Sequence, residues 1–236
     1  MNQHLIKLDN ITKSYGYGSS AMTAVRNFSL DIEAGDFACI WGPSGSGKST
    51  ILNLIGLLDR PDQGSITVKG ADVLKLDDNQ SADFRSLHIG FIFQHFNLVP
   101  VLNALENTML PLEIQGIKDA EARRRAKDLL VEVGLERHLK KRPDEMSGGQ
   151  RQRVAISRAL IAEPDIVLAD EPTANLDSFN SEAIIALMQS LNSKKGVTFV
   201  FATHDTKLLS YAARLIHVSD GQIAEDKRCQ KPSEVA

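Results

Sequence analysis

The residues best suited to do chemistry form one run of eight, Gly42-Pro43-Ser44-Gly45-Ser46-Gly47-Lys48-Ser49. The run matches G-x-x-x-x-G-K-[ST] at every fixed position, which is the pattern of a phosphate-binding loop. Its glycines let the backbone bend round an anion with N–H groups pointing inward, and a helix start adds partial positive charge. Lys48 can reach the β- and γ-phosphates of a nucleotide, and the Ser49 hydroxyl can lie on Mg²⁺. The alternative is a glycine-rich surface turn, which the strand-like residues before the run and the helix-like residues after it disfavour.

A second glycine-containing segment, Met146-Ser147-Gly148-Gly149-Gln150, lies directly before a predicted helix at 151–160. Ser147 is a natural N-cap, and the two glycines leave backbone N–H groups available at a helix start. This arrangement predicts a second anion site, separate from the first.

Two adjacent carboxylates, Asp170 and Glu171, end a predicted buried strand at 165–170. In phosphate-loop enzymes an aspartate in this position holds Mg²⁺, often through water. Neighbouring residues on a strand point in opposite directions, so Glu171 can turn toward the γ-phosphate while Asp170 faces the metal. We expect Glu171 to act as the general base that activates the attacking water. The alternative is an acidic pair that only leads into Pro172.

Three further residues carry a weaker signal. Tyr15 ends a predicted strand and could stack on a nucleotide base, and Gln94 ends another and could offer its amide oxygen to a metal ion or a water. His204 follows a third strand and could donate a hydrogen bond to the γ-phosphate. Taken singly, each is more often a packing residue or a satisfied polar group at a strand end.

The elements that must position these residues alternate between strands and helices. An antiparallel β region is expected over 4–33, with a loop at 16–20. Other strands are expected at 36–41, 65–69, 88–93, 165–170 and 197–202, with a closing hairpin at 214–219 and 222–223. Helices are expected at 50–58, 77–86, 103–112, 119–133, 151–160 and 178–191. Residues from about 226 onward are polar and are expected to fray.

Strand signals give way to helical periodicity between residues 96 and 163. In 119–133 the residues Ala122, Ala126, Leu129, Leu130 and Val133 share one face, opposite a charged face that is expected to be solvated. The chain is therefore predicted to be one α/β domain over 1–236. Its core comprises 1–95, which includes an antiparallel β subdomain, and 164–236, and a helical subdomain at 96–163 interrupts it.

Composition sets looser bounds. A chain of 236 residues can bury a sizeable core, and a net charge of −3 does not indicate a nucleic-acid partner. The longest apolar stretches fall well short of the ~20 residues of a membrane span. The N-terminus does not resemble a secretory signal, and Cys39 and Cys229 offer no disulfide framework. A cytosolic protein is expected, which could still lie against a membrane.

Taken in order, these motifs resemble those of the ATP-binding subunits of ABC transporters over essentially the whole chain. The eight-residue run with Thr50 resembles the Walker A motif, and Met146–Gln150 resembles the LSGGQ signature with Met in place of Leu. Asp170 and Glu171 resemble Walker B and the catalytic glutamate. Gln94, His204 and Tyr15 match the Q-loop, the H-loop and the base-stacking aromatic, and Asp177 ends a segment that matches the D-loop.

The resemblance implies a P-loop NTPase core of RecA-like type and a mechanism. ATP and Mg²⁺ would bind the Walker A residues of one subunit, with Ser49, Gln94 and Asp170 at the metal. Ser147, Gly148, Gly149 and Gln150 of a second copy would close over the γ-phosphate in a head-to-tail homodimer. Lys48, Gln94, Glu171 and His204 would serve hydrolysis, so the chain is expected to be an active ATPase.

Three segments, 55–64, 88–94 and 105–112, resemble the MacB/LolD-type branch of macrolide export and lipoprotein release. In that branch the membrane permease is either fused to the ATPase or a separate chain. A separate permease is expected here, because the chain stops soon after the closing hairpin, and the cassette is expected to lie peripherally on the cytoplasmic side of the inner membrane. Docking is expected near residues 94–112, where Phe96, Leu98, Val99 and Pro100 supply apolar surface. Core packing of the same residues is an equal alternative. The competing functions are a soluble non-transport ABC ATPase, the ATPase of an importer, and a switch that binds ATP without hydrolysing it.

Overall fold

The computed structural model describes residues 4–16 and 21–229 of the chain. It contains two compact units, and each is described by itself. The first comprises residues 1–83 and 198–236, and the second comprises residues 84–197. The expected loop at 16–20 and the tail from 230 onward fall largely or wholly outside the described residues.

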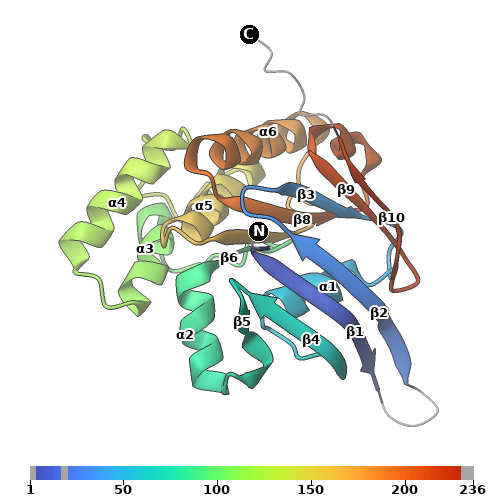
Figure 1. Ribbon diagram of the computed structural model, residues 1–236. Coiled ribbons are helices and arrows are strands. Elements are labelled where there is room, and N and C mark those ends of the chain that lie inside the picture. The colour runs from blue at the N-terminus through green and yellow to red at the C-terminus, as the bar shows by residue number, and fades with distance from the viewer. Residues whose placement is uncertain (1–3, 17–20, 230–236) are drawn as a thin grey trace. The chain divides into compact units, whose positions relative to one another are not determined.

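Parallel strands form the centre of the first unit (Figure 1). Strand β3 (Phe37–Trp41) lies between β8 (Thr198–Thr203) and β9 (Arg214–Ser219), and both pairings are parallel. All six residues of β8 are buried, which is typical of a strand covered on both faces. Strand β10 (Gln222–Arg228) pairs with β9 as the predicted closing hairpin. The hairpin is longer than expected: Arg228 pairs with Arg214, so the prediction of fraying from residue 226 was wrong up to residue 229.

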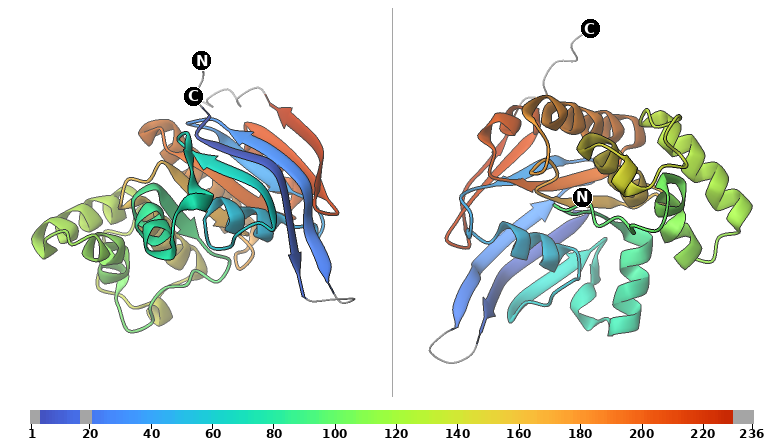
Figure 2. Two further views of the ribbon diagram at one scale, coloured as in Figure 1. Left: turned by 60° about the horizontal axis from the view of Figure 1, so that its bottom comes forward. Right: turned by 180° about the vertical axis from the view of Figure 1, so that it is seen from behind.

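The second sheet of this unit is antiparallel, as expected. Strand β1 (Ile6–Tyr15) pairs with β2 (Met22–Ile32) on one side and with β4 (Gln63–Val68) on the other. A two-residue strand, β5 (Ala71–Asp72), extends it and leads into a short 3₁₀ turn at Val73–Lys75. Helix α1 (Lys48–Ile55) contacts β1, β2 and β8, and so lies between the two sheets in both Figure 1 and Figure 2. Its apolar residues Ile51, Leu54 and Ile55 are fully buried.

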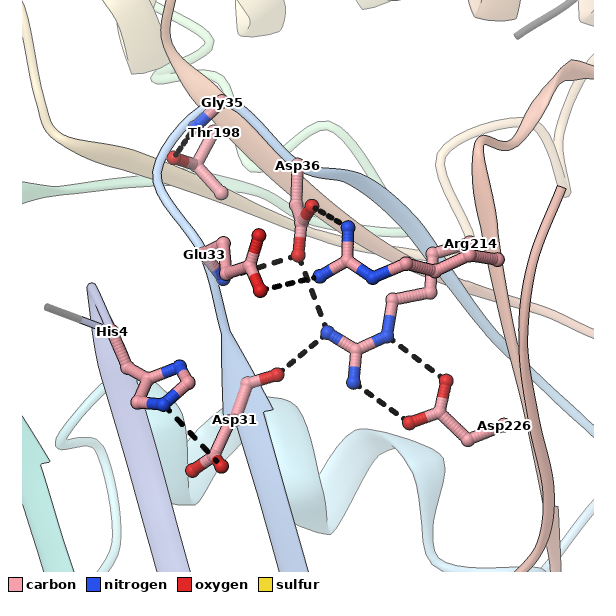
Figure 3. A network of polar contacts seen from close by, with 9 residues as sticks. His4, Asp31, Glu33, Gly35, Asp36, Thr198, Arg214 and Asp226 are labelled. Carbon is pink, nitrogen blue, oxygen red and sulfur yellow. Dashed lines mark hydrogen bonds and ion pairs between the residues drawn. The ribbon is translucent and has the colours of Figure 1, made fainter. Parts of the chain in front are cut away.

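A polar cluster ties strands of both sheets of the first unit together (Figure 3). The guanidinium of Arg214 donates two hydrogen bonds to the carboxylate of Asp226, at 2.9 and 2.7 Å. It also donates to the backbone oxygen of Asp31 at 2.6 Å and to the carboxylate of Asp36 at 3.3 Å. The hydrogen bond to Asp226 is the main reason that the pKa of Arg214 is raised above its ordinary value. One buried cation therefore connects β2, the start of β3, and the β9–β10 hairpin.

The second unit is built on the parallel pair β6 (Ile89–Ile92) and β7 (Ile166–Asp170). Helix α5 (Gly148–Leu160) packs against β6 and contacts α3 (Ala104–Ile114), α4 (Asp119–Glu132) and α6 (Ser178–Lys195). The apolar face predicted for 119–133 is buried as expected. Helix α2 (Asp78–His88) contains the division between the units. Short 3₁₀ turns at Pro143–Glu145 and, in the first unit, at Thr206–Tyr211 were not predicted.

Side chains cap two helices of the second unit in reciprocal pairs at their first turns. Asn103 caps α3 and Ser147 caps α5, and each forms a reciprocal pair with the residue three positions later. Asn107, fully buried in α3, uses its amide to hold the backbone of Val99 at both the N–H and the carbonyl. Within the described residues, none of the helices has the length and apolar character needed to cross a membrane.

Replacing Arg214 by Met is expected to lower the free energy of unfolding by about 2–3 kcal/mol, because it removes the charge-assisted hydrogen bonds of a buried guanidinium and leaves the largely buried side chain of Asp36 without them. Urea denaturation at pH 7 measures this. Arg228→Met is the matched control, since Arg228 pairs with Asp36 and Glu33 but its side chain is 52% exposed. The control is expected to lose less than about 1 kcal/mol. Equal losses in the two variants would contradict the role given to Arg214.

Candidate nucleotide site

Strand register brings two predicted motifs to the same edge of the first unit. In the pairing of β3 with β8, Trp41 lies opposite Thr203. The phosphate-binding loop begins at the next residue after Trp41, and His204 is the next residue after Thr203. Because parallel strands end at the same edge, the loop and the exposed His204 emerge side by side.

The loop itself adopts backbone conformations that suit glycine. Gly45 and Gly47 have φ angles of 80° and 102°, in the left-handed region. A Cβ on Gly47 would fall 2.4 Å from the backbone oxygen of Ala24, so this position is closed by packing against β2. A Cβ on Gly45 would meet no atom within 4 Å. The loop is therefore tightly packed at its base and open at its tip.

The polar groups around the loop fit a bound phosphate. Lys48 is 6% exposed, and its ammonium donates to the backbone oxygens of Gly42 and Pro43, each at 2.9 Å. The buried hydroxyl of Ser46 has no hydrogen-bond partner among the described residues. A buried cation held over the loop, together with an unsatisfied hydroxyl, is the polar surrounding that an anion requires. Exposed Ser44 and Ser49 lie on the two sides of these residues, at the tip and at the helix start.

Tyr15, the predicted base-stacking residue, ends β1 and is 43% exposed. Its hydroxyl donates to the carboxylate of Asp59 at 2.8 Å. The ammonium of Lys13 binds the same carboxylate at 2.7 Å and lies 5.2 Å from the centre of the tyrosine ring. The ring is therefore held in place by its edge, while much of its surface stays accessible to solvent.

The electrostatics of this cluster follow from its partial burial. Burial alone would raise the pKa of Asp59, but hydrogen bonds from Lys13, Tyr15 and the N–H of Arg60 outweigh it, so the pKa lies below its ordinary value. Burial also raises the pKa of Tyr15. Asp59 is therefore a carboxylate, and Tyr15 a neutral phenol, at neutral pH.

The second unit repeats the same arrangement at the ends of β6 and β7, where Ile92 lies opposite Ala169. Gln94 follows β6 by two residues, and Asp170 and Glu171 end and follow β7, so all three lie at one edge. Strand alternation does not set the direction of Glu171. Its φ of 46° places it in the left-handed region, and the carbonyl of Glu171 accepts the N–H of Ala174 in a turn. Strained backbone at a carboxylate in this position points to a functional constraint.

The segment after Gln94 is held by residues distant in the sequence. The side-chain amide of Asn175 donates to the backbone oxygen of Gln94 at 2.5 Å. Phe96 and Asn97 both have left-handed backbones, with φ of 63° and 48°, and the guanidinium of Arg158 donates to both of their carbonyls. Burial lowers the pKa of Arg158 from its ordinary value. Gln94 is thus anchored to the segment before α6, and the residues after it to the end of α5.

The second predicted anion site begins α5 as expected. The hydroxyl of Ser147 accepts the N–H of Gln150 at 3.3 Å, and the side chain of Gln150 accepts the N–H of Ser147 at 3.0 Å. A Cβ on Gly148 would lie 3.0 Å from the side chain of Leu176, and one on Gly149 would lie 3.0 Å from that of Asn180. The absence of these Cβ atoms lets α5 approach the start of α6 closely. Asp177 caps α6 by accepting the N–H of Asn180, which lowers its pKa.

The contacts of four residues were missed in the sequence: those of Asp59, Arg158, His138, whose imidazole lies 3.0 Å from the amide nitrogen of Gln150, and Asn175, which was identified only as part of the D-loop match. Three of them act on residues that are 44 to 81 positions away in the chain. A single sequence offers no signal for such pairs, because hydrogen-bonding side chains at surface positions are common and only folding selects their partners.

Replacing Asp59 by Asn is expected to lower stability at neutral pH, and the difference from the parent should shrink in acid. A carboxylate whose folded-state pKa is depressed stabilises the fold above its unfolded value of about 3.8, and this contribution is lost as pH falls through the folded-state value. Urea denaturation from pH 7 to 2.5 measures this. Tyr15→Phe, which removes one of the three hydrogen bonds to Asp59, should give a smaller difference. A gap between parent and Asp59→Asn that widens below pH 3.8 would contradict the assignment.

Comparison with known proteins agrees with this geometry. The family model described as ABC transporter matches residues 25–174. The lipoprotein-releasing system ATP-binding protein LolD of Geobacter metallireducens is 43% identical, over 94% of this chain and 99% of its own length. The macrolide export ATP-binding/permease protein MacB of Syntrophobacter fumaroxidans is 45% identical over 93% of this chain, which spans only 31% of the MacB length.

The fold also matches solved structures. The ATP-binding cassette MJ0796, solved as a dimer in a post-hydrolysis state with ADP and Pi, superposes with a TM-score of 0.88 at 42% identity, covering 96% of this chain and all of its own. A protein named MJ0796 from Methanocaldococcus jannaschii is 45% identical over 95% of this chain. The family match covers more than half of the chain, and the relatives extend over nearly all of it. The chain belongs to the ABC transporter family, as an ATP-binding cassette of the branch that includes LolD and MacB.

Proposed function

We propose that this cassette hydrolyses ATP as one half of a head-to-tail dimer and that closure and reopening of the dimer drive a separate membrane permease. The observation that carries the proposal is the phosphate-binding loop, where Lys48 is buried over the loop carbonyls, Ser46 lacks a partner among the described residues, and the tip at Gly45 is open. These features suit a triphosphate better than a structural turn.

In the first unit, the backbone from Gly42 to Thr50 would bind the phosphates, and Lys48 would shift from the loop carbonyls to the β- and γ-phosphates. Tyr15 would stack on the adenine with its ring fixed by Asp59. His204, beside the loop through the Trp41–Thr203 register, would donate a hydrogen bond to the γ-phosphate. Binding would therefore need little reorganisation of the backbone.

The residues that would hold Mg²⁺ are Ser49, Gln94 and Asp170, which offer a hydroxyl, an amide oxygen and a carboxylate. Such hard oxygen ligands fit Mg²⁺, which commonly keeps waters and phosphate oxygens as its other ligands. When bound, the ion would neutralise charge that develops during phosphoryl transfer.

Glu171 would take a proton from the attacking water, since it lies at the strand edge with Gln94 and its left-handed backbone sets its direction apart from Asp170. Lys48 would stabilise the negative charge on the transferred phosphoryl group. Gln94 would report the state of the nucleotide to the helices, because Asn175 holds its backbone and Arg158 holds the two residues that follow His95.

Dimerisation would complete the site. Ser147, Gly148, Gly149 and Gln150 of the partner copy would close over the γ-phosphate, with the N–H groups at the start of α5 as donors. Asp177 would lie near the dimer contact through the segment that precedes α6. The solved dimer of the related MJ0796 supports a two-fold arrangement for this chain too.

The permease partner would be a separate chain, in keeping with the relative LolD, which is named as the ATP-binding protein of its system, and the cassette would lie peripherally on the cytoplasmic side of the inner membrane. The related systems named for lipoprotein release and macrolide export favour an exporter or a lipoprotein-release system. The docking surface would include Val99 and Val101, which are 36% and 70% exposed after Gln94. Phe96 and Leu98 are half-buried and would support this surface from below.

Replacing Glu171 by Gln is expected to lower ATP turnover by about 10²–10⁴-fold, because the amide cannot accept the proton of the water. Binding of a fluorescent ATP analogue should persist, and dimers should accumulate with ATP and Mg²⁺. Phosphate release and size-exclusion chromatography measure these effects. The control is Glu182→Gln, an exposed acid on α6, which should keep parental turnover. Unchanged turnover in Glu171→Gln would refute the role of Glu171, and no turnover in the parent protein would refute the ATPase.

Replacing Val101 by Asp is expected to reduce capture of the permease by about tenfold, because an uncompensated charge in an apolar contact costs more than about 1.4 kcal/mol. Tagged protein would be incubated with detergent-solubilised membranes from its own cells, and captured membrane proteins quantified by mass spectrometry. Basal ATPase activity should not change. Val131→Asp, 47% exposed on α4, is the matched control. Equal capture by both variants would contradict docking at this surface, and capture of no permease by the parent would favour a soluble ABC ATPase.

A further inference from the structure

The side chain of Gln150 makes two hydrogen bonds in opposite directions. Its amide oxygen accepts the backbone N–H of Ser147 at 3.0 Å, which closes the start of α5. Its amide nitrogen lies 3.0 Å from the Nε2 atom of His138. The contact joins the signature segment to the loop that precedes it, and the P-loop chemistry does not use His138.

These two contacts together indicate which ring nitrogen of His138 faces a donor. The backbone N–H of Ser147 can only donate, so the atom of Gln150 that faces it must be the oxygen. The NH₂ group of Gln150 therefore faces His138, and Nε2 of the imidazole must accept. Acceptance at Nε2 requires the neutral ring with its proton on Nδ1.

The other two states of the ring do not fit. A proton on Nε2, in the other neutral tautomer or in the imidazolium, would place two donors 3.0 Å apart. The Nδ1 atom is buried and has no hydrogen-bond partner among the residues that the structure describes. Nδ1 therefore carries an unsatisfied buried N–H in the proposed tautomer, and the hydrogen bond from Gln150 to Nε2 must offset this cost.

The position of His138 is fixed by its own loop. Its N–H donates to the carbonyl of Leu135, and its carbonyl accepts the N–H of Lys141. The same loop accepts hydrogen bonds from the start of α3, where Ala104 donates to Lys141 and Leu105 donates to Leu139. The backbone of His138 thus belongs to a loop that is hydrogen-bonded to α3, while its side chain contacts Gln150 in the first turn of α5.

We propose that neutral His138 is a positioning residue for the signature segment: by accepting from Gln150 it keeps the amide oxygen on Ser147 and so keeps the first turn of α5 in its closed, anion-binding form. The inference rests on the proposed function, since that first turn is the lid over the nucleotide of the partner copy. It assigns no contact between His138 and ATP.

The tautomer is tested directly in the full-length protein labelled with ¹⁵N at histidine. Long-range ¹H–¹⁵N correlation spectra at pH 8 should show a histidine with a protonated Nδ1 and an unprotonated Nε2 whose signal disappears in His138→Gln. A second Nδ1-protonated histidine, His88, is expected to persist in that variant, because its Nδ1 lies 2.6 Å from the carboxylate of Asp165. A protonated Nε2 on His138 at this pH would overturn the proposal whatever the outcome of the ATPase assays.

The positioning role is tested with His138→Leu, which removes the acceptor, and His138→Gln, whose amide oxygen can replace it. Loss of one hydrogen bond should lower ATP turnover by about fivefold in His138→Leu. The affinity of the monomer for a fluorescent ATP analogue should be unchanged, and His138→Gln should recover most of the turnover. Lys140→Gln, an exposed change in the same loop, should behave as the parent.

Amide hydrogen exchange supplies a readout that does not depend on catalysis. The N–H of Ser147 should exchange about fivefold faster in His138→Leu than in the parent, and close to the parental rate in His138→Gln. Parental exchange and turnover in His138→Leu would overturn the proposal, as would equal impairment of the Leu and Gln variants. If His138→Leu does not fold, the exchange rate of Ser147 in His138→Gln and the tautomer in the parent decide. An inactive parent with the expected exchange pattern would refute only the proposed ATPase.

Discussion

The candidate site depends on where parallel strands end. Trp41 beside Thr203 and Ile92 beside Ala169 are ordinary pairings of buried strands, yet each delivers two polar segments to one edge. Backbone hydrogen bonds fix this register. The positions at which the polar segments begin are therefore set more closely than a loop alone could set them. The buried apolar residues of β3, β7 and β8 therefore serve the chemistry indirectly, by fixing the positions at which the chain leaves the sheet.

Beyond the strand ends, the chain departs from regular structure in a controlled way. Glu171, Phe96 and Asn97 all have left-handed backbones, which cost free energy for residues with a Cβ. The turn at Glu171 and the guanidinium of Arg158 offset this cost with hydrogen bonds. Ser147 caps the start of α5, and Arg158 lies in its last turn. Helix α5 therefore connects the segment after Gln94 to the signature segment at its own first turn.

The sequence allowed the fold class and most strands and helices to be predicted, because apolar periodicity and glycine-containing turns are local signals. The N-cap at Ser147 was predicted and found, as was the buried face of 119–133. The family resemblance, including the LolD and MacB branch, was confirmed by the comparisons. The roles assigned to Gln94, Glu171 and His204 in hydrolysis stay predictions. The length of β10 was missed because its polar residues gave no strand signal, and pairing with β9 decides it. The contacts of Asp59, Asn175 and His138 were missed, since the fold decides which partners these side chains meet.

The glycines of the phosphate-binding loop serve two requirements at once. A Cβ on Gly42 would fall 2.1 Å from the backbone oxygen of Val218, and Gly47 is equally confined by Ala24. Substituting either glycine would therefore disturb the packing of the strands, whether or not a nucleotide is bound. A single mutation at either position is therefore not expected to give a protein that is inactive but still folded. A side chain at Gly45 would meet no such crowding. A degenerate copy of this gene that still encodes a folded protein should therefore retain Gly42 and Gly47 long after its chemistry is lost.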